Sequence, residues 1–232
     1  MICVVFHITS FVATEREFGM SDLIDAMLPG GSAFRGRLIR QSSTYLSFVA
    51  VYLPGWIAVA SVLSAVVFPK TSHGIPLGYN LFSGLAFSSF SMFGASIFNK
   101  ASFSEPTMVI ITLVAGMVPQ VLGEQSRSMV AILSLLFPSA NYTYFMAGLA
   151  QWELSGEDVD LMKPPTEDHT GDFKHVKMYL YWLFMVIQIL VYPILAFGLE
   201  HLRFSAASPG RIFSQSQHIG APTVQLANFS KT

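Results

Sequence analysis

The sequence predicts an all-α, polytopic integral membrane protein, a bundle of helices that cross a bilayer, and three observations lead to this fold class. Hydrophobic residues make up 52% of the 232 residues and charged residues only 12%, whereas soluble chains carry about 25% charged residues. Several stretches without charge are long enough, at about 1.5 Å per helical residue, to cross a hydrocarbon core of roughly 30 Å. The formal net charge is −1, which argues against a nucleic-acid partner because such partners require clustered positive charge.

The first apolar stretch, residues 1–13, is too short to cross a bilayer alone, and we expect it to be the end of a span. A signal peptide is the alternative, but no basic residue precedes the apolar run. The next region, residues 14–41, contains acidic and basic residues and a Pro-Gly-Gly turn. We therefore expect residues 14–41 to lie in the cytosol.

Four further segments are predicted to cross the bilayer as helices, because each is free of charge over most of its length. The last of them starts with several aromatic residues, as is typical of a helix that enters a membrane interface. The predicted spans are residues 42–68, 78–98, 105–122 and 176–200.

Residues 128–150 are apolar enough to enter the membrane but are interrupted near their middle by Pro138, Ser139 and Asn141. A proline breaks the helical hydrogen bonding and frees backbone groups that lipid cannot satisfy. A straight crossing and a re-entrant pair of short helices are both compatible with this pattern. We expect the re-entrant hairpin, which would place the acidic loop 151–175 on the outer side.

The basic residues do not decide between these two topologies, because both divide the 13 lysines and arginines in the same proportion across the membrane. Asn141-Tyr142-Thr143 matches the N-glycosylation acceptor pattern, which makes Asn141 a candidate glycosylation site on the outer side. His169 and His175 lie in the acidic loop, but no second histidine at helical spacing and no cysteine ligand accompanies them. We therefore expect no metal site.

Uncharged polar and small residues inside the spans mark further candidate positions. Gln188 lies in the last span, where it either contacts a substrate or hydrogen-bonds to a neighbouring helix. Small residues spaced i, i+4, i+7 and i+11 form one face of the span 78–98, a face that favours close helix packing over the lining of a lipid path. These residues are Gly84, Ser88, Ser91 and Ala95.

A charged motif follows the first apolar stretch, and the broken hairpin comes later. The motif consists of Glu15, Arg16, Glu17, Met20, Asp22 and Met27, and the hairpin contains LLFPSANYTYFMAGLAQWE at residues 135–153. Together with the closely spaced spans, these features resemble the transmembrane domain of an ABC transporter of subfamily A, especially its fungus-like members. The resemblance covers residues 1–204. The chain departs from the family at Gly19 and Ser21, where members carry basic residues, and at residues 28–31, where Leu-Pro-Gly-Gly replaces a Gly-Leu ending.

The resemblance implies an ABC-2-type membrane domain with a type V exporter fold and an outer re-entrant hairpin. It implies that residues 14–31 contact a nucleotide-binding domain, with the six motif residues coupling that domain to the spans. The implied partners are this domain, a second transmembrane half, the lipid bilayer and a lipid or other amphipathic substrate. The expected function is therefore the membrane-spanning part of an ATP-driven lipid transporter.

No G-x-x-x-x-G-K-[ST] phosphate-binding motif occurs in the sequence. We therefore expect no enzymatic activity and no cofactor in this chain alone, with ATP and magnesium bound by a separate nucleotide-binding domain. On this interpretation the chain is a fragment, and its polar residues 205–232 are a flexible cytosolic linker. The alternative is a structural or adaptor membrane protein, or a degenerate fragment, that transports nothing. An intramembrane enzyme is disfavoured, because no span carries a nucleophile with a histidine and an acid.

Overall fold

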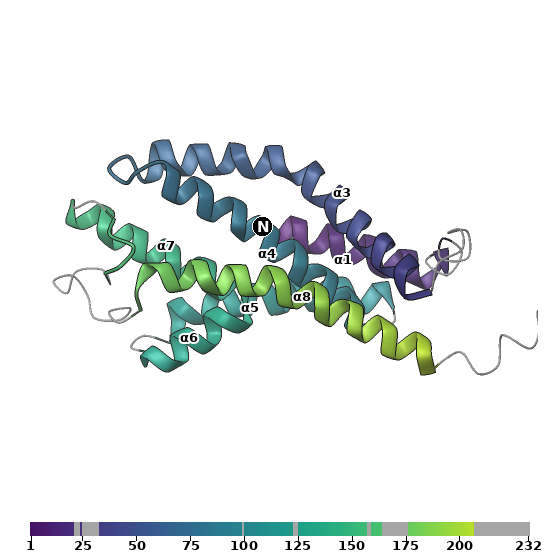
Figure 1. The fold of residues 1–232 in the computed structure, drawn as a ribbon. Helices are drawn as coiled ribbons and strands as arrows, with labels where there is room; N and C mark the ends of the chain where they lie inside the picture. The colour runs from purple at the N-terminus through teal and green to yellow at the C-terminus, as the bar shows by residue number, and fades with distance from the viewer. Residues whose placement is uncertain are drawn as a thin grey trace, which may run out of the picture.

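The computed structural model describes residues 1–20, 24, 33–98, 100–122, 125–156, 159–163 and 176–206, which form an all-α bundle (Figure 1). These residues contain seven α-helices, one of which continues into a π-helix. The helices are α1 Ile2–Glu17, α3 Ala33–Val62, the π-helix η1 Leu63–Val67, α4 Gly74–Ile97, α5 Ala101–Val121, α6 Arg127–Leu136, α7 Pro138–Ser155 and α8 Met178–Ala206.

Three helices are long and apolar enough to cross a membrane. They are α3 with η1 over Arg35–Val67, α5 over Ala101–Val121 and α8 over Met178–Leu202. Only 17%, 28% and 22% of their most apolar windows is buried inside the bundle, so most of their apolar side chains point outward. Water-soluble proteins rarely expose such continuous apolar surface, whereas a lipid bilayer accepts it. The three helices therefore indicate a multi-pass membrane protein.

The predicted span 78–98 forms helix α4, but α4 is not among these three helices. Its serines and glycines lower its hydropathy, and it packs against α1, α3, α5, α7 and α8. Tyr79, Asn80 and Ser88 are fully buried. Because protein rather than lipid surrounds most of α4, its side chains do not have to be apolar. Helix α4 is therefore the central helix of the bundle, and its crossing of the membrane stays a prediction.

Some helix boundaries differ from the expected ones. The apolar stretch 1–13 continues as helix α1 to Glu17, so the first three residues of the charged motif form its last turn. Helix α3 begins at Ala33, which makes the last part of the polar region 14–41 helical. The apolar stretches predicted the central parts of these helices. The helices extend further, because the charged residues at their ends continue the backbone hydrogen bonding.

The helix is interrupted at Phe137, between α6 and α7, where the sequence predicted an interruption. Pro138 begins α7, a position that suits proline because the first helical N–H has no intrahelical acceptor. In Figure 1, α6 leads from one end of the bundle toward its middle, and α7 returns to the same end.

Hydrogen bonds support this course of the hairpin. Near the end of α7, Glu153 accepts the backbone N–H groups of Lys70 and Thr71, at 2.9 and 3.1 Å. Tyr144 of α7 donates to Gln125, which immediately precedes α6. We call this end of the molecule the Glu153 end, defined by residues 68–73 and Glu153. The end of α7 lies there, and the start of α6 lies beside the middle of α7.

Helix α8 supplies the donors that the last turn of α6 lacks. The amide of Gln188 donates to the carbonyl oxygens of Ser134 at 2.8 Å and Leu135 at 3.0 Å. The hydroxyl of Tyr192 donates to the carbonyl oxygen of Leu136. Carbonyl groups without donors are costly in an apolar environment. These contacts therefore explain how the chain tolerates a helix break in the interior of the bundle.

Candidate functional site

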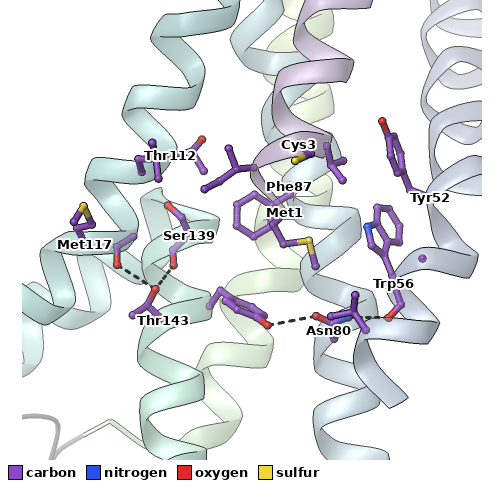
Figure 2. Close-up of a pocket in the computed structure, with 17 residues that line it drawn as sticks. Met1, Cys3, Tyr52, Trp56, Asn80, Phe87, Thr112, Met117, Ser139 and Thr143 are labelled. Atoms are coloured by element: carbon purple, nitrogen blue, oxygen red, sulfur yellow. Dashed lines mark hydrogen bonds between the residues drawn. The ribbon is translucent and has the colours of Figure 1, made fainter. Parts of the chain in front are cut away.

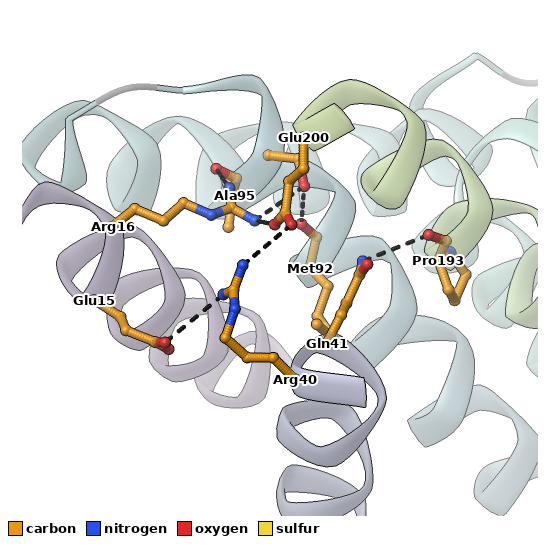
Figure 3. A network of polar contacts seen from close by, with 9 residues as sticks. Glu15, Arg16, Arg40, Gln41, Met92, Ala95, Pro193 and Glu200 are labelled. Atoms are coloured by element: carbon orange, nitrogen blue, oxygen red, sulfur yellow. Dashed lines mark hydrogen bonds and ion pairs between the residues drawn. The ribbon is translucent and has the colours of Figure 1, made fainter. Parts of the chain in front are cut away.

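A charged cluster joins four helices at the end of the bundle opposite the Glu153 end (Figure 3). Arg16, in the last turn of α1, forms an ion pair with Glu200 of α8. The same guanidinium donates to the carbonyl oxygen of Ala95 at 2.6 Å and to the Ser96 hydroxyl at 3.3 Å, both near the end of α4. We call this the Glu200 end, defined by Arg16, Arg40, Ser96 and Glu200.

Arg40 of α3 completes the cluster. Its guanidinium nitrogens lie 3.7 Å from a Glu15 carboxylate oxygen and 3.6 Å from the second Glu200 oxygen. The side chains of Arg40 and Glu200 are only 8% and 5% exposed. Burial of single charges is unfavourable, but two arginines and two glutamates balance one another here. The cluster therefore fixes α1, α3 and α8 relative to one another.

Glu17 makes a different contact, with the start of α5. Its carboxylate accepts the backbone N–H of Ala101 at 3.1 Å. A carboxylate is favourable there because the first N–H groups of a helix lack acceptors and carry partial positive charge. Glu17 thus caps α5 across space, since Lys100 at the N-cap position provides no side-chain hydrogen bond.

The structure therefore uses Glu15, Arg16 and Glu17 in contacts within the chain. Met20 is 55% exposed, and Phe18, which the motif did not include, is 77% exposed. Asp22 and Met27 lie outside the described residues. Among the described residues that follow α1, the exposed large apolar side chains are Phe18, Met20 and Ile24.

Sequence reasoning missed Arg40 and Glu200 as members of this cluster. A signal for Glu200 was present, because it is the only acidic residue in α8. A carboxylate that ends a long apolar helix usually requires a cationic partner. The sequence did not identify that partner, because Arg16 lies 184 positions away from Glu200 along the chain.

The small-residue face of α4 lies against α1 and α3. A Cβ atom on Gly84 would lie 2.4 Å from the nearest ring atom of Trp56 in α3. Ser88, Ser91 and Ala95 are fully buried, and the backbone oxygens of Ser91 and Ala95 accept hydrogen bonds from α1 side chains. This face therefore permits close approach of three helices.

Asn141, the candidate glycosylation residue, is fully buried in the hairpin. Its side-chain amide donates to the backbone carbonyl oxygen of Tyr181 at 3.0 Å. The backbone carbonyl oxygen of Asn141 accepts a hydrogen bond from the Tyr79 hydroxyl at 3.2 Å. The folded protein does not present this amide to a glycosyltransferase. Modification of Asn141 would have to precede the docking of α7 onto α8.

A pocket of about 630 Å³ lies between α1, α3, α4, α5 and α7 (Figure 2). Most of its lining is apolar, but a polar group forms one side. The Asn80 amide donates to the Trp56 carbonyl oxygen at 2.9 Å, and the Tyr142 hydroxyl lies 3.5 Å from the Asn80 side-chain oxygen. Thr143 donates to a backbone oxygen of α5 or α7. We call this space the Asn80 pocket.

Within the part of the chain that the structure describes, no three histidine, cysteine or acidic residues are grouped so as to hold a metal ion. His169 and His175 are not among the described residues. The two features with functional potential are thus the charged cluster at the Glu200 end and the Asn80 pocket.

Comparison with known proteins adds no family assignment. No protein-family model matches the chain, and no curated protein sequence matches it.

Proposed function

We propose that this chain is the membrane-spanning part of an ATP-driven ABC-type transporter that moves lipids or other amphipathic substrates. The observation that carries the proposal is the charged cluster at the Glu200 end, where Arg16, Arg40 and Glu200 join the end of α1 to α3 and α8. Two of the three candidate spans, α3 and α8, thereby share one connection to the segment that follows α1.

Such a connection would transmit motion. A nucleotide-binding domain that pulls on residues 14–31 would move α1, and the ion pairs would carry this displacement to α3 and α8. A change of angle between α3 and α8 would open or close the bundle toward lipid. ATP and magnesium would bind the separate domain and contact no residue of this chain.

The partner would contact exposed apolar residues rather than the paired charges. Phe18 and Met20 are exposed beside the cluster, and a hollow of about 520 Å³ lined by Met20, Glu15 and Arg40 lies next to them. Apolar anchors that enter a pocket typically contribute most to such an interface. We therefore assign the coupling contact mainly to Phe18 and Met20.

The test is co-reconstitution of the full chain with a nucleotide-binding domain of an ABC transporter of subfamily A from the same organism. ATP-dependent movement of a fluorescent phospholipid across proteoliposomes is measured. We expect movement with the native chain, and the double variant Phe18→Asp, Met20→Asp should weaken co-purification about tenfold or more, the change that ~1.4 kcal/mol produces.

Leu154→Asp is the matched control, because Leu154 is equally exposed, at 78%, but lies at the Glu153 end. It should leave co-purification and movement unchanged. Movement that is independent of ATP, or equal loss in the control and the double variant, would contradict the proposal.

A structural or adaptor role is the second candidate, and one observation favours it. Glu15, Arg16 and Glu17 have partners inside the chain, so a second protein is not required to satisfy them. An adaptor would bind the nucleotide-binding domain, or another partner, without moving lipid. Binding that Phe18→Asp, Met20→Asp abolishes, with no ATP-dependent movement in the native chain, would support this role instead.

A further inference from the structure

We propose that a groove between α3 and α8 binds a phospholipid with a net negative headgroup, with one acyl chain in the groove and the phosphate at Arg35. The inference does not depend on ATP-driven transport, because it concerns a lipid that stays bound to the chain rather than a transported one. It follows from the position of the groove, the absence of charge in its lining and the exposed arginine beyond one of its ends.

The groove lies between two of the three candidate spans. Its volume is about 390 Å³, and residues of α3 and α8 form its walls, with the buried Met92 of α4 at its base. Leu46 of α3 and Ile194 of α8 are 63% and 68% exposed, so the groove is open to the outside of the bundle. In a bilayer this opening would face hydrocarbon, and an acyl chain would fill it.

The lining admits an uncharged chain but no charged headgroup. Among the described residues that line the groove, none has an acidic, lysine or arginine side chain. A phosphate inside the groove would lose its hydration without gaining a counter-charge, which is strongly unfavourable in an apolar site. The headgroup of a bound phospholipid therefore has to lie beyond an end of the groove.

One end of the groove lies next to the charged cluster at the Glu200 end. Gln41, a lining residue whose amide donates to the Pro193 carbonyl oxygen at 3.5 Å, directly follows Arg40 of the cluster. Figure 3 shows Gln41 and Pro193 beside the cluster. Charged residues at the ends of membrane helices mark the depth of the interface, where phospholipid headgroups also lie.

Arg35 continues the lining face of α3 toward this interface. Arg35, Ser42 and Leu46 are spaced i, i+7 and i+11, so they lie on one face of the helix. Arg35 is roughly 10 Å from Ser42 along the helix axis, at 1.5 Å per residue. Its side chain is exposed, and within the part of the chain that the structure describes no carboxylate forms an ion pair with it.

The charge at this position complements a phosphate. A guanidinium group binds phosphate oxygens through two parallel hydrogen bonds. The first turn of α3, which contains Arg35, has no acidic residue, and the partial positive charge of a helix start adds to that of the arginine. A choline group would gain no counter-charge from this turn. The bound lipid is therefore one with a net negative headgroup.

The experiment uses the full chain in phosphatidylcholine proteoliposomes without nucleotide or partner. Trace amounts of photoreactive phosphatidylglycerol or phosphatidylcholine, with the same diazirine-bearing acyl chain, are crosslinked to the protein in parallel samples. The modified peptides are mapped by mass spectrometry. We expect phosphatidylglycerol to label the groove residues of α3 and α8 about fivefold more than phosphatidylcholine does, the ratio that ~1 kcal/mol for one arginine near a membrane surface produces.

Two variants with matched controls refine the test. Arg35→Gln should lower labelling by phosphatidylglycerol to the level of phosphatidylcholine, whereas Arg127→Gln, at an exposed arginine in the first turn of α6, should not. Ile194→Trp should block the groove to both lipids. Leu195→Trp is its control, because Leu195 is exposed on the same helix but does not line the groove. Melting temperatures of the variants report whether each of them folds.

Equal labelling of the groove by the two lipids would overturn the proposal, as would labelling by phosphatidylglycerol that Arg35→Gln leaves unchanged or that Arg127→Gln lowers equally. Crosslinks between the groove and a second copy of the chain would also overturn it, because they would identify a helix as the occupant. A failure of ATP-dependent movement would leave this result unaffected, so the two proposals fail separately.

Discussion

Single glycines set how closely the helices approach one another. Gly84 faces Trp56, and a Cβ atom there would overlap the indole ring. Gly55, on α3, has no atom within 4 Å of the position of a Cβ. The two positions therefore differ in packing alone, because both lie inside a helix.

We predict opposite effects of alanine at these two positions. Gly84→Ala should destabilise the protein by about 1–3 kcal/mol, because α3 must move away from α4. Gly55→Ala should be neutral or stabilise it by up to about 1 kcal/mol, since alanine favours helix over glycine. Reversible unfolding in bicelles measures both values. Equal effects of the two substitutions would show that a side chain at position 84 does not push α3 away from α4.

The charged cluster gives a second prediction at this scale. Glu200→Gln removes the negative charge between Arg16 and Arg40 and should destabilise the protein by about 3–5 kcal/mol, the cost typical of breaking a buried pair. Arg16→Met combined with Glu200→Leu should cost less than the sum of the two single changes, because neither charge is then left alone. Unfolding free energies of the four proteins in the cycle test this coupling, and strict additivity would contradict it.

At the scale of elements, the broken hairpin depends on α8. The carbonyl groups at the end of α6 receive donors from Gln188 and Tyr192. The sequence left two roles open for Gln188, a substrate contact or a hydrogen bond to a neighbouring helix. In the structure Gln188 is 1% exposed and makes the hydrogen bonds to the neighbouring helix.

We predict that Gln188→Leu destabilises the protein by about 1–3 kcal/mol, because it leaves two buried carbonyl groups without a side-chain donor. Tyr192→Phe should have a smaller effect, about 0.5–1.5 kcal/mol, as expected for one hydrogen bond. Tyr179→Phe is the control, since Tyr179 lies at the start of α8 and is 38% exposed. If all three variants unfold like the native protein, α8 does not hold the hairpin.

The loop between η1 and α4 is tied to α7 by Glu153, which lies outside the candidate spans. Burial by itself would raise the pKa of this carboxyl group, but hydrogen bonds from Lys70 and Thr71 and the charge of Lys70 lower it below its ordinary 4.5. The folded state therefore favours the deprotonated form. The resulting stability is complete above pH 4.5 and is lost as the pH falls through the lowered pKa of the folded state.

We predict that the amide protection factors of Lys70 and Thr71 decrease below pH 4.5. Glu153→Gln should lower them at every pH and abolish the decrease. Asp160→Asn is the control, because the Asp160–Lys163 pair is largely exposed and such pairs contribute little. Hydrogen exchange measured at several pH values tests this, and a pH profile that Glu153→Gln leaves unchanged would contradict it.

For the whole molecule, the course of the helices predicts a topology. The end of α1 and the end of α8 meet in the Arg16–Glu200 pair, whereas the end of α7 lies at the Glu153 end. In a membrane, residues after α1 and at the end of α8 would therefore face one side, and the end of α7 the other.

We predict that cysteines at Phe18 and Leu202 react with a membrane-impermeant maleimide from one side, and cysteines at Leu154 and Met162 from the opposite side. All four positions are well exposed, and Cys3, the single native cysteine, is replaced by serine beforehand. Labelling of sealed and permeabilised vesicles distinguishes the two sides. Reaction of Leu154→Cys from the same side as Phe18→Cys would contradict a hairpin that returns to its starting side.

The pattern of apolar residues sufficed to predict the helical class, three long apolar helices that could cross a membrane and the break at Pro138. These features depend on local properties: the length of an uncharged run and the lack of a backbone donor in proline. The same pattern did not indicate that α4 is surrounded by other helices, because a one-dimensional hydropathy profile does not distinguish such a helix from one that faces lipid.

By itself, the sequence determined that the chain is helical and suited to a bilayer, since both follow from the order of apolar and charged residues. Only the tertiary structure decided which polar groups meet: Arg16 with Glu200, Gln188 with the end of α6, and Asn80 with Tyr142. The physical reason is that each of these pairs joins different helices. Their contacts depend on how the helices pack and rotate against one another, which no local pattern of residues specifies.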